Sequence, residues 1–171
     1  GIGASLSNLS YPATSLNDAG QIAIAWTGFV GNLRGIQVEI YDTDGTGLIS
    51  PFVPHNSTLG IQRNADIILH NDGTKSEHGF VSIRPYAENS FLVVWLDGRE
   101  TAGKEHGGGQ MTLRSAIVFE DGSIEYDTLL DERTCDCCQT GVAIGPNDEM
   151  IVAYRDRSED EIRDISIVRW Q

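Results

Sequence analysis

The sequence predicts an all-β fold, because one pattern of strands and turns occurs three times along its 171 residues. In each copy an apolar strand ends in an aromatic residue, a polar turn follows, and an apolar–arginine pair opens an alternating strand. The copies lie at 21–40, 91–118 and 150–168. Four-stranded meanders that recur at such an interval are typical of a β-propeller. We therefore predict a partial, incomplete β-propeller built of four-stranded antiparallel blades.

The first predicted blade covers about 11–54 and follows a mobile lead-in at 1–10, where the residues are small and polar. Turns rich in Asn, Asp and Gly divide the blade into four strands. The first lies near 13–15, the second ends at Trp26, and the third ends before the Asp-Gly turn at 42–47. The fourth is expected at 48–53.

The remaining blades are unequal in length. Residues 55–76 contain two loop segments and fit only a blade remnant, with one short strand near 65–69. The second full blade, about 77–131, has strands expected at 79–84, 91–96, 111–119 and 128–130. The last, about 139–171, has strands expected at 140–144, 151–154 and 162–170 and lacks a fourth. We expect residues 11–171 to form a single domain with no amphipathic helix of useful length.

Too few blades to close a ring would leave open strand edges, which proteins normally cover or protect. The chain is therefore expected to be a piece of a longer polypeptide, or to have its open blade edges covered by other protein chains. A β-sandwich is the alternative architecture, because it also combines short strands with frequent turns.

Composition excludes several kinds of partner. A formal net charge of -13 and a pI near 4.5 argue against nucleic acid and against an anionic membrane surface. No apolar run is long enough for a transmembrane segment, and no signal peptide is visible. Because the first residue is glycine, any export signal could already be removed. We predict a periplasmic or extracellular protein without a cofactor.

Several motifs resemble the sialidase-like (BNR/exo-α-sialidase) six-bladed propellers of bacteria. They lie at 77–82, 95–100, 135–140 and 154–165, and include a Cys-Asp-Cys-Cys sequence. The resemblance implies a site in which three arginines hold a sugar carboxylate, a tyrosine assisted by a glutamate is the nucleophile, and an aspartate is the acid/base. The family's Arg-Ile-Pro signature is reduced to Ile83-Arg84-Pro85, and its Asp-boxes lack the leading serine and closing tryptophan.

Arg34, Arg114 and Arg163 are the ligand-binding candidates, because each opens the third strand of its repeat. Repeat-equivalent residues are related by rotation about the propeller axis, so the three guanidinium groups would converge on one carboxylated glycan. The alternative is that each arginine bonds to neighbouring loops within its own blade.

Asp97, Glu100 and Tyr154 are the candidates for a nucleophile and acid/base pair. Tyr154 also aligns with Trp26 and Trp95, which predicts an aromatic side chain in the blade core. Asp97 is followed by Gly98, which is most simply a turn. We therefore predict a non-catalytic module that acts as a binding or scaffold subunit of a larger assembly. An exo-sialidase-type glycoside hydrolase is the alternative.

Cys135, Cys137 and Cys138 are the only cysteines. Together with His78 and His106 they are candidates for a metal or redox site, because soft thiolates and imidazoles are metal ligands. Their spacing differs from that of a zinc finger. A local disulfide and reduced, buried thiols are the two alternatives.

Overall fold

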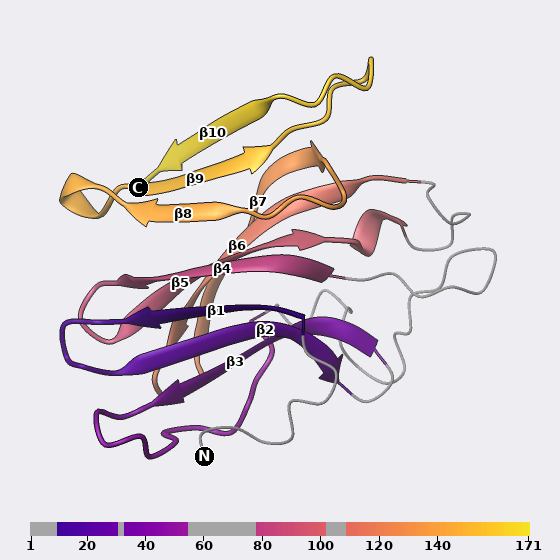
Figure 1. Ribbon diagram of the computed structural model, residues 1–171. Coiled ribbons are helices and arrows are strands. Elements are labelled where there is room, and N and C mark those ends of the chain that lie inside the picture. Colours follow the sequence, from indigo (N-terminus) through magenta and orange to yellow (C-terminus); the bar gives the residue numbers. More distant parts are fainter. Residues whose placement is uncertain (1–9, 31–32, 55–77, 102–108) are drawn as a thin grey trace.

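The computed structural model describes residues 10–30, 33–54, 78–101 and 109–171 (Figure 1). These residues form ten strands in three antiparallel sheets, with the orders β1-β2-β3, β4-β5-β6-β7 and β10-β9-β8. The predicted all-β fold is confirmed. The expected blade remnant at 55–76, and all but the last residue of the expected lead-in, lie outside the described residues.

The first sheet contains β1 (Ser10–Leu16), β2 (Ile22–Val30) and β3 (Leu33–Tyr41). The fourth strand predicted at 48–53 is reduced to isolated bridges along β3. The backbone N–H groups of Val38 and Phe52 each donate to the other's carbonyl oxygen, at 2.8 and 2.9 Å. Leu48 N–H donates to Ile40 O at 2.8 Å. The segment therefore follows the edge of the sheet without forming a regular strand.

The second sheet has all four predicted strands: β4 (His78–Tyr86), β5 (Ser90–Asp97), β6 (Met111–Phe119) and β7 (Ile124–Thr134). β7 is much longer than the predicted 128–130, because it pairs with β6 from Ile124, opposite Val118, to Thr134, opposite Met111. The turn before β7 depends on Gly122, whose positive φ of 82° favours glycine.

The third sheet contains β8 (Gly141–Ile144), β9 (Met150–Arg155) and β10 (Ile165–Trp170). It has three strands, as predicted. The helical elements of the described residues are two short 3-10 turns, η2 (Arg99–Thr101) and η3 (Pro146–Asp148). No helix in this part of the chain has the length and apolar character needed to cross a bilayer.

β5 is the centre of the molecule, because all eight of its residues are buried. Side chains alternate along a strand, so Phe91, Val93 and Trp95 pack with the first sheet while Leu92, Val94 and Leu96 pack with the third. The sheets therefore stack face to face, with one apolar core on each side of the middle sheet.

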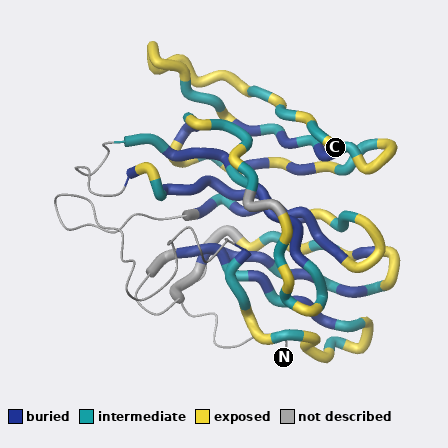
Figure 2. The backbone as a smooth tube through the Cα atoms, turned by 180° about the vertical axis from the view of Figure 1, so that it is seen from behind, coloured by how far each residue is buried: buried dark blue, intermediate teal, exposed yellow. Residues whose placement is uncertain are grey.

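The first strands of the three sheets also lie together, β1 against β4 and β4 against β8. Successive sheets stacked in this way, each beginning at the shared side, are the arrangement of neighbouring propeller blades. The described residues thus form a partial propeller. Figure 2 shows that burial is concentrated in the middle sheet and that exposed residues recur along β10.

Candidate functional site

The aromatic residue that recurs on each second strand, Trp26, Trp95 or Tyr154, gives a common reference point for the three sheets. Its cross-strand partner on the third strand is defined by the pairing register. Trp26, Trp95 and Tyr154 are paired with Gln37, Arg114 and Ser166, respectively. The residue opposite the aromatic is therefore arginine in the middle sheet alone.

The predicted equivalence of the three arginines is thus incorrect. Arg34 is paired with Phe29. It lies three residues before Gln37, which is the position that corresponds to Arg114. The side chain of Arg34 lies outside the described part of the structure. Arg163 precedes β10 in an exposed loop, where its guanidinium lies 3.4 Å from Glu161. A ligand-binding role for each arginine stays a prediction, but a shared position in the repeat no longer supports it.

Arg114 lies half-buried in a polar groove of about 280 Å³. The groove is lined by side chains from η2, β6, β7 and the residue before β6: Glu100, Gln110, Thr112, Arg114, Leu129 and Glu132. One guanidinium and two carboxylates therefore share the groove. Sequence reasoning missed Glu132, because the predicted fourth strand of this blade ended at residue 130.

Asp97 is fully buried, and its carboxylate is held by neighbouring donors. Arg99 Nε donates to Oδ1 and Arg99 Nη2 to Oδ2, both at 2.8 Å. Trp95 Nε1 donates to Oδ2 at 2.9 Å, and the Arg99 backbone N–H donates to Oδ1 at 3.0 Å. Such paired charge fixes the turn at the end of β5. This geometry fits the predicted turn and does not resemble an acid/base group facing a substrate.

Tyr154 is buried between the second and third sheets, as expected for a core aromatic. Its hydroxyl donates a hydrogen bond to Asp131 Oδ2 on β7. Burial, followed by the hydrogen bond and negative charge of Asp131, raises the pKa of Tyr154 well above its ordinary value. A neutral, buried phenol of this kind is a poor nucleophile.

The three cysteines are free thiols at the end of β7, in the loop that leads to β8. Cys135 is buried, Cys138 is half-buried and Cys137 is exposed. Burial raises the pKa of Cys135, but hydrogen bonds with the other two thiols and the charge of Arg155 outweigh it, so this pKa is lowered. The hydrogen bond with Cys135, together with burial, raises the pKa of Cys137 to about 11.

The two histidines proposed as additional metal ligands cannot be placed with the cysteines. His78 begins β4, but its side chain lies outside the described part of the structure. His106 lies wholly outside the described residues.

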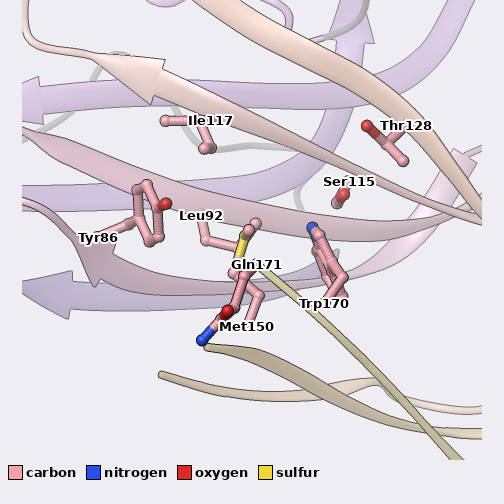
Figure 3. A pocket seen from close by; sticks show the side chains of 8 residues that line it. All are labelled: Tyr86, Leu92, Ser115, Ile117, Thr128, Met150, Trp170 and Gln171. Carbon is pink, nitrogen blue, oxygen red and sulfur yellow. The ribbon is translucent and has the colours of Figure 1, made fainter. Parts of the chain in front are cut away.

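An apolar cavity of about 280 Å³ lies between the second and third sheets (Figure 3). Its lining consists of Tyr86, Leu92, Ser115, Ile117, Thr128, Met150, Trp170 and Gln171. Figure 3 shows Trp170 and Gln171 approaching from the end of β10, opposite the strands of the middle sheet. The described residues that line this cavity offer hydroxyl and amide groups but no carboxylate or histidine side chain, so the cavity suits packing better than acid–base chemistry.

No protein-family model matches the chain, and no curated protein matches it. Among solved structures it is similar to the GH43 endo-arabinanase from Bacillus licheniformis, with 12% sequence identity and a TM-score of 0.41. The match covers 97% of this chain and 55% of the arabinanase chain, so the chain spans about half the length of that structure. A likeness at this level does not assign a function.

Proposed function

We propose that the chain is a non-catalytic, sialidase-like propeller module that acts as a binding or scaffold subunit of a larger, extracytoplasmic assembly. The observation that supports this proposal is the outer face of the third sheet, on which Ala143, Ile165 and Ile167 are exposed and Ile151 and Ala153 are half-buried. The sialidase-like family is proposed from the sequence motifs.

Residues at the positions equivalent to this outer face are buried in the other two sheets. The residues on either side of Gln37, opposite the aromatic of the first sheet, are Ile36 and Val38, and both are fully buried. On either side of Ser166 in the third sheet are Ile165 and Ile167, which are 73% and 63% exposed. In the first two sheets these positions are covered by the next sheet, so the third sheet presents an unused stacking surface.

Burial of this face against a partner would contribute favourably to the free energy of binding. Full burial of an isoleucine side chain contributes about 1.5–3 kcal/mol. With Ile165 and Ile167 exposed by 73% and 63%, covering both contributes about 2–4 kcal/mol by the same relation. β10 is also the edge of its sheet in the described residues, so its outer backbone groups can pair with an added strand. We assign this face to a second protein chain.

The test is the mass and subunit composition of the protein isolated under mild conditions from its natural source. The wild type is expected in a complex with a different polypeptide. A variant with Ile165→Asp and Ile167→Asp is expected to lose that polypeptide and keep its thermal stability. Leu48→Asp is the matched control, because Leu48 is 41% exposed but lies outside this face. The proposal fails if the wild type and the double variant have the same composition.

The polar groove at Arg114 favours a second candidate, a glycoside hydrolase of the exo-sialidase type acting on carboxylated sugars. An arginine can hold a sugar carboxylate through paired hydrogen bonds, and two carboxylic residues can supply acid/base and nucleophilic groups. Glu100 and Glu132 line the groove with Arg114. Hydrolysis of a fluorogenic sialoside, lost in Glu132→Gln and Arg114→Ala but kept in Arg163→Ala, would support this candidate. No turnover by the wild type would remove it.

A further inference from the structure

The loop at 135–138 brings together three sulfur atoms that neither candidate function uses. All three Sγ atoms lie within 4.8 Å of one another. The separations are 2.9 Å for Cys135–Cys138, 3.7 Å for Cys135–Cys137 and 3.9 Å for Cys137–Cys138. In an extended chain, neighbouring side chains point to opposite sides. The turn at Asp136 and Cys137 instead directs the last two thiols toward the first.

Hydrogen bonds hold both ends of this loop on strands of the folded core. Before the turn, Cys135 N–H donates to Arg155 O on β9 at 2.9 Å. After the turn, Gln139 Nε2 donates to Val81 O on β4 at 3.0 Å. The thiols are therefore positioned at the junction of the second and third sheets by rigid elements, as a preorganised ligand set requires.

The convergent set is composed of sulfur alone, which selects soft metal ions. With metal–sulfur bonds of about 2.3 Å, the sulfurs of a planar three-coordinate site lie about 4.0 Å apart. Two of the three separations, 3.7 and 3.9 Å, are already close to this spacing. The remaining pair at 2.9 Å must open by about 1 Å. Exposed Cys137 gives an ion a route from solvent.

We propose that Cys135, Cys137 and Cys138 form a three-coordinate thiolate site for a soft monovalent metal ion, copper(I). Each thiol releases its proton to solvent as its sulfur binds the ion, and the copper stays in the same oxidation state throughout. Zinc is less suited, because it normally takes four ligands. Arg155 Nη1 lies 3.6 Å from Cys138 Sγ and offsets part of the negative charge of the thiolates.

Cys137 distinguishes this site from a simple pair of thiols. Disulfide chemistry between Cys135 and Cys138, the nearest pair at 2.9 Å, does not require the third cysteine. A trigonal copper site requires all three sulfurs. Because Cys137 is exposed, its replacement by serine removes no buried packing.

The test is a copper(I) titration of the reduced chain under inert gas, in competition with the chromophoric chelator bicinchoninate. The wild type is expected to keep one copper ion per chain bound in the presence of the chelator. It is also expected to develop a sulfur-to-copper charge-transfer absorption. In Cys137→Ser and Cys138→Ser the affinity is expected to fall by at least the roughly 10–100-fold that loss of an outer-shell partner costs. Asp136→Asn, in the same turn, is the matched control and should bind like the wild type. Thermal melting verifies that each variant is folded.

Several results would overturn the copper site. One is a wild type that yields all its copper to the chelator. Another is a Cys137→Ser variant that binds as tightly as the wild type. Peptide mass analysis that finds a Cys135–Cys138 disulfide in the isolated protein would also reject it, as would displacement of copper by an equal amount of zinc.

Discussion

The ion pair at the end of β5 allows the structural role of Asp97 to be measured. Replacing Arg99 with methionine keeps much of the side-chain volume but removes the guanidinium that holds both carboxylate oxygens at 2.8 Å. Asp97 would then remain as a buried negative charge, because its side chain is 0% exposed and that of Arg99 is 9% exposed. Breaking a buried pair by removing one partner costs about 3–5 kcal/mol. We expect a loss of this size in the free energy of unfolding.

The assay is urea unfolding followed by tryptophan fluorescence, with linear extrapolation to water. Trp95 is a suitable reporter, because its indole N–H donates directly to Asp97 at 2.9 Å. Comparing Arg99→Met and Asp97→Asn with the double variant completes a double-mutant cycle. The double variant should be more stable than the sum of the single losses predicts, because it removes the buried carboxylate charge together with the guanidinium.

Arg169→Met is the matched control for this experiment. Arg169 pairs with Glu149, but its side chain is 63% exposed, so its loss should cost less than about 1 kcal/mol. If Arg99→Met costs no more than this control, the paired carboxylate does not stabilise the turn. Asp97 would then return as a candidate catalytic residue.

Two further predictions concern titrating groups. Burial first, and then Glu39, raise the pKa of Tyr41 from 10.0 to about 12, and burial raises that of Tyr154 further. Both phenols therefore stabilise the fold fully at a pH below their unfolded pKa. The free energy of unfolding should fall as the pH rises from 10.0 toward about 12. Unfolding curves of Tyr41→Phe should show a weaker fall over the same range. The hydrogen bond from Arg157 first, followed by the charges of Arg157 and Arg163, lowers the pKa of Glu161. Its contribution is present above the ordinary carboxyl pKa and lost on acidification. Amide protection factors in the β9–β10 loop, which correct for the intrinsic pH dependence of exchange, should therefore fall at acid pH in the wild type and change little in Glu161→Gln.

The strands were predictable wherever the apolar pattern was strong. β5 lies within a continuous apolar run, and its complete burial between two sheets is what such a run indicates. β7 was predicted too short, because its long polar edge has little apolar alternation and its length is determined by pairing with β6. The segment at 48–53 was predicted to form a regular fourth strand of the first sheet, but only isolated bridges tie it to β3.

The candidate site was less predictable, because side-chain positions depend on register. Aligning the apolar–arginine pairs placed Arg163 at the start of a strand. In the structure Asp156 N–H donates to Asp164 O at 2.9 Å, so a longer loop separates β9 from β10 and Arg163 falls within it. A one-dimensional repeat cannot show such a shift, whereas cross-strand pairing does. Likewise, the sequence shows that the cysteines are close along the chain but not that their sulfur atoms converge.

Cross-linking from the outer face of the third sheet tests whether another protein chain stacks against this face. A photo-activatable amino acid would replace Ile167, which is 63% exposed on β10, in protein produced in its natural source. We expect a covalent adduct with a different polypeptide at position 167 and none with the same probe at position 48. No adduct at position 167, or equal labelling at both positions, would show that this face does not stack against a partner chain.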